Sequence, residues 1–221
     1  MNQPDSSRQA VFWECTNPAC GFRYVEAPPR GRGEVCPRCG AAAYPAAEVA
    51  SSPRETEGQQ VLPQRMPRSP FPVLAVLLDN LRSAYNVGAA FRTADAAGVA
   101  HVYISGITPS PTHPNVHKTA LGAERWVPWS SHPNGVALAT RLKAEGWALW
   151  ALETDAAARR LHELPLPERL VLAFGNEVAG LDPGILAQAD AVVALPMWGR
   201  KRSLNVASAL AAALYVLRCG K

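Results

Sequence analysis

Short apolar segments of β type alternate with segments of helical spacing throughout the chain after residue 72. Strands are expected at residues 73–79, 101–105, 125–128, 147–152, 170–174 and 191–195, and helices at residues 86–97, 133–145, 183–189 and 203–218. Apolar strands that alternate with helices predict a mostly parallel sheet with helices on both faces. The predicted fold class is therefore α/β.

Polar residues and glycines gather where the predicted strands end, and an open α/β sheet binds its ligands at the carboxyl ends of its strands. Each of these groups is also typical of an ordinary loop or helix cap, so none identifies a site alone. They are Asp79 with Asn80, Ser105 with Gly106, Glu153 with Thr154, residues 175–177, and Pro196 with Met197.

Four of the five cysteines form two close pairs near the N-terminus. Four residues separate Cys15 from Cys20, and two residues separate Cys36 from Cys39. Two such pairs supply the four thiolates of a tetrahedral zinc site, so we predict a structural zinc ribbon over residues 1–45. Two disulfides and a redox-active Cys36/Cys39 pair are the alternatives, but nothing in the sequence indicates an oxidising compartment.

Residues 46–72 are rich in Ala, Pro, Ser, Glu and Gln and lack periodic apolar positions, which predicts a linker before a domain at residues 73–221. The start of the chain has no signal-peptide core, and no apolar run is long enough to cross a bilayer, so a cytoplasmic protein is expected. The net charge of +4 permits an anionic partner. Candidate phosphate contacts, for which a solvated surface is the alternative, are Arg23, Arg30, Arg32, Arg38 and the run Arg200, Lys201, Arg202.

The first of three motifs covers residues 80–95. Asn86 is well placed to cap the following helix, and Gly88 permits the close approach of another backbone. Arg92 follows Asn86 by roughly 600° of helical rotation, so the two side chains would meet a ligand from different directions. A surface ion pair between Arg92 and Asp95 is the alternative.

The second motif, residues 170–181, runs from an apolar strand into a glycine-rich turn that begins at Gly175, and glycines suit a loop whose backbone touches a ligand. The third motif, residues 195–208, combines an apolar strand end, a basic loop and a polar helix start. Ser203 is a reasonable N-cap, but capping alone does not explain Asn205 inside the expected first turn.

In this order and spacing, the three motifs resemble those of the SPOUT methyltransferases, specifically the TrmH (SpoU) branch. The resemblance covers roughly residues 80–218, and residues 117–123 also fit. One departure is Ala207, which stands where the branch usually has a serine, with Ser208 next. The resemblance implies an α/β domain with a C-terminal trefoil knot, a homodimer, and transfer of a methyl group from S-adenosylmethionine to a ribose 2′-hydroxyl of tRNA or rRNA.

The resemblance also implies site residues. It assigns catalysis to Arg92, with Asn86, Glu177, Ser203 and Asn205 positioning Arg92 and the ribose, and it assigns the S-adenosylmethionine pocket to Leu152, Gly175, Leu195, Met197 and Leu204. Because the pKa of arginine exceeds about 12, we expect Arg92 to bridge the target phosphate and the developing alkoxide instead of acting as a free base. The leaving group is neutral, so the transfer requires no metal and the predicted zinc is structural.

Three other functions fit parts of the sequence. A Rossmann-type methyltransferase would need a glycine-rich loop after residues 73–79, where Asn80 to Ser83 stand instead. A non-catalytic RNA-binding protein on a SPOUT-like scaffold is opposed by the retention of Arg92 and the polar residues named with it. Protein–protein scaffolding through the zinc ribbon is the third.

Overall fold

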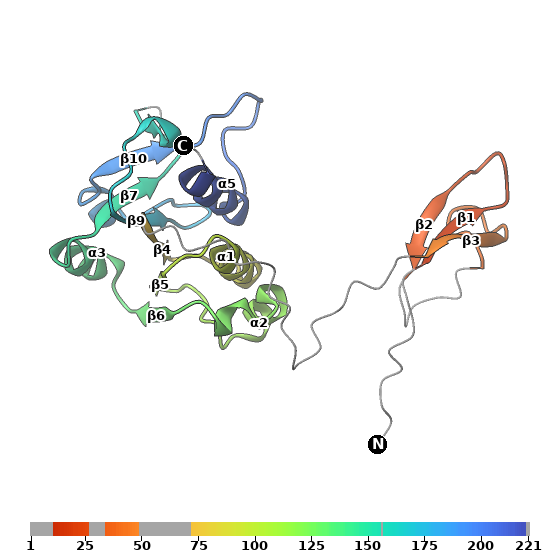
Figure 1. Ribbon diagram of the computed structural model, residues 1–221, viewed down its shortest axis with the longest axis horizontal. Coiled ribbons are helices and arrows are strands. Elements are labelled where there is room, and N and C mark those ends of the chain that lie inside the picture. Colours follow the sequence, from red (N-terminus) through yellow and green to blue (C-terminus); the bar gives the residue numbers. More distant parts are fainter. Residues whose placement is uncertain (1–10, 27–33, 49–71, 156, 220–221) are drawn as a thin grey trace, which may run out of the picture. The chain divides into compact units, whose positions relative to one another are not determined.

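The computed structural model describes residues 11–26, 34–48, 72–155 and 157–219. The chain divides into two compact units, Met1–Arg65 and Met66–Lys221, which Figure 1 draws with the sequence coloured from red to blue. Most of the predicted linker lies outside the described residues, as do Arg30 and Arg32. No helix in the described ranges combines the length and apolar character needed to cross a membrane.

A three-stranded antiparallel sheet forms the first unit, in the order β2 (Arg23–Glu26), β1 (Val11–Cys15), β3 (Ala43–Glu48). β3 extends past residue 45, where the sequence predicted the ribbon to end. Pro45 lies inside β3, and this edge strand tolerates proline because its outer side needs no backbone donor. Pairing with β1, which composition cannot reveal, sets this boundary.

Seven parallel strands form the sheet of the second unit, in the order β6-β5-β4-β9-β7-β10-β8. The predicted mostly parallel α/β sheet is therefore confirmed. Its strands are β4 (Val73–Asp79), β5 (His101–Ser105), β6 (Trp129–His132), β7 (Ala148–Leu152), β8 (Arg159–Arg160), β9 (Arg169–Phe174) and β10 (Ala191–Ala194).

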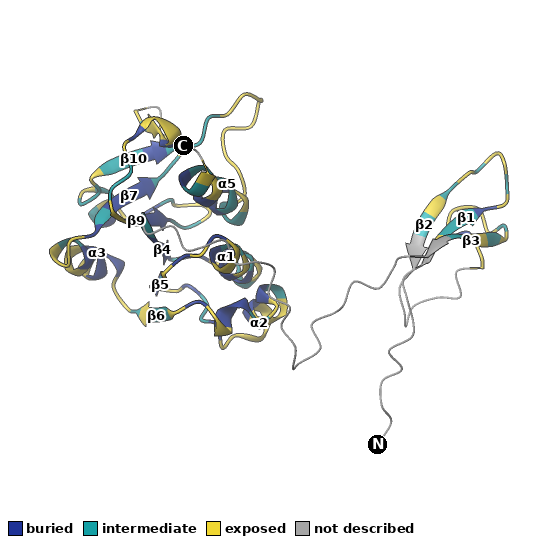
Figure 2. Cartoon of the chain, viewed as in Figure 1, coloured by how far each residue is buried: buried dark blue, intermediate teal, exposed yellow. Residues whose placement is uncertain are grey.

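Helices cover both faces of this sheet, as the alternation along β4 shows. Leu74, Val76 and Leu78 pack into one apolar core, whereas Ala75 and Leu77 pack into the other. Buried residues of α1 and α5 belong to the first core and those of α3 and α4 to the second, an arrangement that Figures 1 and 2 show. The helices are α1 (Ala84–Ala96), α2 (Pro114–Ala120), α3 (Gly135–Ala144), α4 (Pro183–Leu186) and α5 (Val206–Cys219).

The strand predicted at residues 125–128 is wrong. Ala123–Arg125 form a short 3-10 helix, η1, and the strand is β6 at Trp129–His132. Buried Glu124 accepts a 2.5 Å hydrogen bond from Nδ1 of His117 on α2, which holds this segment against a helix that was not predicted. Local apolar spacing could not reveal this contact.

Two helices have N-caps other than those predicted. Ser83 caps α1, because its hydroxyl accepts the backbone N–H of Asn86, so Asn86 lies inside the helix. Asn205 caps α5 by accepting the N–H groups of Ala207 and Ser208. Ser203 therefore precedes the helix and does not cap it.

Arg218 joins the C-terminal ends of α1 and α5. Its guanidinium donates to the carbonyl oxygens of Ala97, Gly98 and Pro72 at 2.8–2.9 Å. Partial burial lowers the pKa of this guanidinium. These bonds also satisfy carbonyls at the end of α1 that have no partner within the helix.

Candidate active site

A hydrogen-bonded network joins residues from all three sequence motifs at the N-terminal ends of α1 and α5. The Glu177 carboxylate accepts the backbone N–H groups of Arg82 and Ser83, at 2.9 and 3.2 Å, and Nδ2 of Asn86 at 3.0 Å. The Oδ1 atom of Asn86 in turn accepts Nδ2 of Asn205 at 3.1 Å. Motif two therefore binds motif one, and motif one binds motif three.

The carboxylate of Glu177 is kept ionised by this arrangement. Partial burial acts to raise the pKa of Glu177, but the bonds from Arg82, Asn86 and Ser83 outweigh it and hold the pKa below its usual value. The Oδ1 atom of Asn205 is occupied in capping α5, so its amide nitrogen faces Asn86. The side chain of Asn86 is therefore held from two directions, by Glu177 and by Asn205.

The turn after β9 is folded tightly on itself. Asn176 and Gly180 exchange two backbone hydrogen bonds, and a Cβ atom added at Gly175 would lie 2.1 Å from the backbone nitrogen of Leu181. Only glycine fits at Gly175, because the neighbouring atoms are backbone. Asn176 also donates to the carbonyl of Asn80 at 2.7 Å, which fastens the turn to the end of β4.

A pocket of about 180 Å³ opens at the carboxyl ends of β7 and β10. Four of the five residues expected to hold the cofactor line it, namely Leu152, Leu195, Met197 and Leu204; Gly175 does not. The remaining lining residues are Glu153, Thr154, Asp155, Ala194, Arg202, Ser203 and Ala209.

Apolar and charged groups share the walls of this pocket. The Oε1 atom of Glu153 accepts the N–H of Leu181 at 2.7 Å, which connects the pocket to the glycine turn. From the sequence, Glu153 was predicted only as a polar residue at a strand end, and Asp155 was not predicted. Their position at the carboxyl end of a buried strand was the available signal.

The expected catalytic residues fall into two groups. Asn86 is hydrogen-bonded to both Glu177 and Asn205, and Ser203 lines the pocket. Arg92 is exposed on α1, and its side chain makes no hydrogen bond or ion pair with any residue that the structure describes, the alternative partner Asp95 included. Its guanidinium is therefore free to meet a ligand from outside the network.

The cysteine pairs converge in the first unit. The four sulfur atoms of Cys15, Cys20, Cys36 and Cys39 lie within 4.8 Å of one another, with 3.5 Å between Cys15 and Cys39 and 3.9 Å between Cys20 and Cys36. These distances far exceed a disulfide bond of about 2.05 Å. They bracket the spacing of about 3.8 Å that Zn–S bonds of about 2.3 Å impose in a tetrahedron.

Backbone amides stabilise a thiolate in this cluster. Burial acts to raise the pKa of Cys36, but backbone N–H groups of Arg38 and Cys39 donate to its sulfur and lower the pKa to about 7. Gly21 and Gly40 follow the second cysteine of each pair at φ values of 54° and 74°, which lets each turn close. The donor set thus fits a tetrahedral metal ion.

Comparison with known proteins assigns the second unit. A family model described as the SpoU rRNA Methylase family matches residues 73–215. The chain belongs to this family. The predicted resemblance to the SpoU branch is confirmed, and the match contains the pocket and the Asn86–Glu177–Asn205 network.

Relatives of this SpoU family chain include enzymes of two substrate classes. A tRNA (guanosine(18)-2′-O)-methyltransferase of Thermus thermophilus is 32% identical over 157 residues, covering 71% of this chain and 77% of the relative. A 23S rRNA (guanosine-2′-O-)-methyltransferase of Pseudomonas putida is 32% identical over 165 residues, covering 74% of this chain and 66% of that relative.

Solved structures agree with this assignment. The SpoU methyltransferase AviRb from Streptomyces viridochromogenes, in complex with AdoMet, superposes with a TM-score of 0.61 at 26% identity, covering 65% of this chain and 56% of that one. A TrmH/SpoU tRNA modifying enzyme of A. aeolicus gives a TM-score of 0.61 at 29% identity, covering 67% and 75%. The chain therefore spans little more than half of AviRb.

Proposed function

We propose that this protein is an S-adenosylmethionine-dependent RNA methyltransferase that modifies ribose 2′-hydroxyl groups of tRNA or rRNA. The observation that carries the proposal is the polar network through Glu177, Asn86 and Asn205, which joins the three motifs. Residues of motif three also line the pocket at the carboxyl ends of β7 and β10. The relatives named above are tRNA and rRNA 2′-O-methyltransferases, which supports RNA as the substrate class.

The pocket residues suit S-adenosylmethionine chemically. Leu152, Leu195, Met197 and Leu204 offer apolar contacts for an adenine ring, and the carboxylates of Glu153 and Asp155 complement a ligand with positively charged and hydroxyl groups. Gly175 does not line the pocket, but its lack of a side chain lets Gly180 and Leu181 pack against it. The N–H of Leu181 can then donate to Glu153 in the pocket wall. The bound cofactor supplies an electrophilic methyl group on a sulfonium.

The chain's own task is to bind the ribose and weaken its O–H bond. Arg92 is the group proposed for this step, because its guanidinium is exposed and has no partner among the described residues. Its fixed charge would contact the target phosphate and stabilise the alkoxide as the proton leaves. Asn86, Glu177 and Asn205 hold the start of α1, and with it the direction in which Arg92 projects.

We also propose that the protein acts as a homodimer with α5 in the interface. The Arg92 side chain forms no hydrogen bond with Ser203 or with the Asn86–Glu177–Asn205 network among the described residues, and we propose that a second copy supplies the arginine for each pocket. Tyr215 on α5 leaves 49% of its surface exposed and offers an apolar contact. Sedimentation at increasing protein concentration tests this part, and a monomer at every concentration would contradict it.

Structural zinc in the first unit is the second cofactor we propose, on the sulfur spacing described above. The C-terminal trefoil knot and the cytoplasmic location stay predictions.

Methyl transfer to RNA tests the proposed function. The full chain is incubated with methyl-labelled S-adenosylmethionine and total RNA that lacks the modification, and label should accumulate in the RNA. The rival function is a non-catalytic RNA-binding protein on the same scaffold. Calorimetry separates the two, because RNA binding without detectable S-adenosylmethionine binding would favour the rival.

A further inference from the structure

Trp198 is the most exposed of the large apolar side chains that the structure describes, with 91% of its surface accessible. It lies in residues 196–204, the segment between β10 and α5, which we call the platform segment. A single exposed apolar residue is common on protein surfaces. Trp198 differs because of the residues around it.

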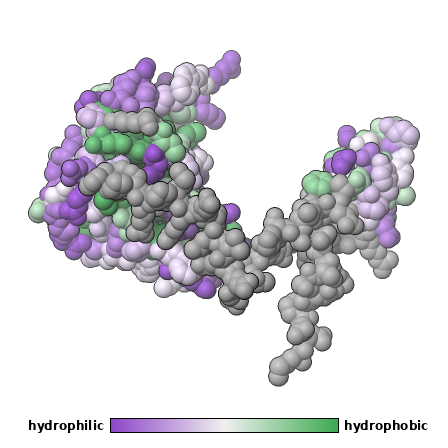
Figure 3. All heavy atoms as spheres, viewed as in Figure 1, coloured by the Kyte–Doolittle hydropathy of each residue, from purple (hydrophilic) through white to green (hydrophobic). Residues whose placement is uncertain are grey.

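Three consecutive cations follow Trp198 in the platform segment. Arg200, Lys201 and Arg202 are all exposed, and none forms an ion pair within the described part of the chain. Figures 1 and 3 show the segment projecting from the second unit with a hydrophilic tip. The charge is therefore available to an anionic ligand at long range.

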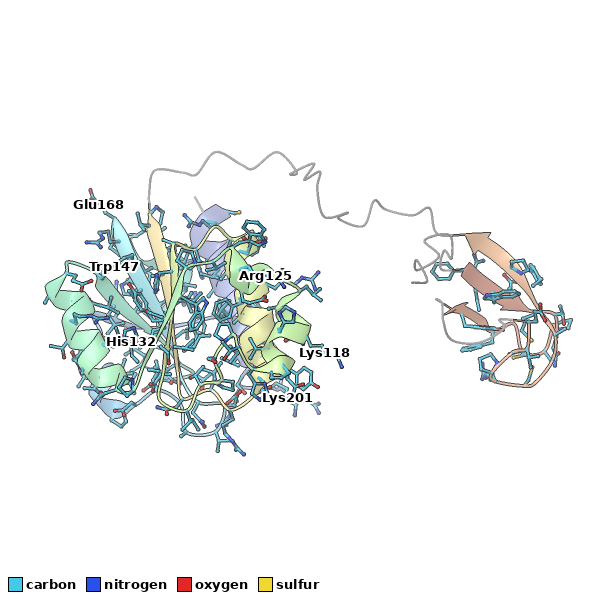
Figure 4. All side chains as sticks on the ribbon, turned by 90° about the horizontal axis from the view of Figure 1, so that it is seen from below. Lys118, Arg125, His132, Trp147, Glu168 and Lys201 are labelled. Carbon is cyan, nitrogen blue, oxygen red and sulfur yellow. The ribbon has the colours of Figure 1, made fainter. Side chains whose placement is uncertain are left out.

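The same segment forms one wall of the pocket. Met197, Arg202, Ser203 and Leu204 are lining residues, while Trp198 is not. In Figure 4, Lys201 lies at the lower end of the second unit, and Glu168, which precedes β9, lies at the upper end. The exposed indole and the cations thus stand beside the proposed cofactor site.

We propose that the platform segment holds an unpaired stretch of the RNA substrate, with a base stacked on Trp198 and phosphates bound by Arg200 and Lys201. An aromatic ring stacks on any unpaired base, whereas duplex bases are already stacked on one another. A second copy of the chain fits this surface less well, because a two-fold contact centred here would bring two sets of three cations together. The inference rests on the proposed function and adds that the methylated nucleotide lies in an unpaired region.

Fluorescence anisotropy tests the proposal with a labelled single-stranded RNA of about 12 nucleotides and the same strand annealed to its complement. Trp198→Ala should weaken single-strand binding on the order of tenfold. Trp198→Phe should retain most of the affinity, because phenylalanine still stacks. Trp126→Ala is the matched control, since Trp126 is 64% exposed and lies outside the pocket, and it should bind as wild type does.

The cations are tested by the salt dependence of the same binding. Arg200→Ala and Lys201→Ala should each reduce the slope of log affinity against log salt by about 1. A wild type that binds the duplex as tightly as the single strand would overturn the proposal. So would a Trp198→Ala variant with unchanged RNA affinity, or one whose only defect is loss of self-association.

The wild-type protein separates this inference from the function on which it rests. Suppose that wild type transfers methyl groups to total RNA, and that Trp198→Ala does so at the same rate and with the same dependence on RNA concentration. Then only the role proposed for the platform segment is wrong. If the wild type neither binds S-adenosylmethionine nor transfers methyl groups, the proposed function fails. Calorimetry should give the same cofactor affinity for Trp198→Ala as for wild type, because Trp198 does not line the pocket.

Discussion

Glu177 shows at the residue scale how one carboxylate holds two motifs together. Its pKa lies below the usual value of 4.5, because hydrogen bonds from motif one outweigh the effect of burial. A lowered folded-state pKa means that ionised Glu177 stabilises the fold above the unfolded value and loses this effect as pH falls through the folded value. Glu177→Gln should therefore be less stable than wild type near neutral pH, and the difference should shrink below about pH 4.5. Urea denaturation across this range measures it, and equal stability at neutral pH would contradict the assignment.

Arg92 is the residue on which the proposed chemistry depends. Arg92→Ala should lower the rate of methyl transfer by on the order of a hundredfold or more, because it removes the charge that stabilises the developing alkoxide. Cofactor affinity should not change, since Arg92 does not line the pocket. Arg92→Lys keeps the charge but loses the two-pronged geometry, so it should recover little activity. Near-normal transfer by Arg92→Ala, with normal RNA binding, would remove Arg92 from the mechanism.

The glycine turn after β9 is the element that positions the pocket. Gly175→Ala should destabilise the protein by about 1–3 kcal/mol, because its Cβ would collide with backbone atoms of Gly180 and Leu181 that cannot easily move. Gly199→Ala is the matched control, since a Cβ atom there meets nothing within 4 Å. Thermal and chemical denaturation of both variants would show the contrast, and similar stabilities would contradict the packing described for the turn.

Elements with strong apolar spacing were predictable from the sequence, and elements fixed by distant contacts were not. The strands at residues 73–79 and 101–105 agree with the prediction because their apolar runs are continuous. β6 was misplaced because its sequence, Trp129–His132, is mostly polar and it pairs with only one neighbour, β5. α2 was missed because only Val116 and Ala120 of its residues are buried.

The residues of the site were predictable from the sequence, but the hydrogen bonds between them were not. The motif resemblance named Asn86, Glu177 and Asn205, but the donors to Glu177 include backbone groups of Arg82 and Ser83, which no side-chain pattern reveals. Helix starts were ambiguous for a related reason, since serine and asparagine both cap helices well. Capping by Ser203 could not explain an asparagine at position 205. The structure explains it, because Asn205 is itself the N-cap of α5.

For the whole molecule, the two units should respond separately to metal removal. Mass spectrometry of the native protein should find one zinc ion per chain, and chelation should unfold the first unit because, of its described residues, only Cys15 and Cys36 are buried. Affinity of the second unit for S-adenosylmethionine should persist, since its own cores stabilise it. Hydrogen exchange resolved by peptide measures both responses. Unchanged protection of residues 11–26 after complete chelation would contradict a structural metal.

The position of the transferred methyl group is the most direct test of the function proposed for the whole molecule. RNA methylated by the full chain is digested to nucleosides, and mass spectrometry locates the added mass on the sugar or on the base. A ribose 2′-O-methyl nucleoside is expected. A nucleoside methylated on its base would keep the fold and the cofactor but contradict the proposed reaction.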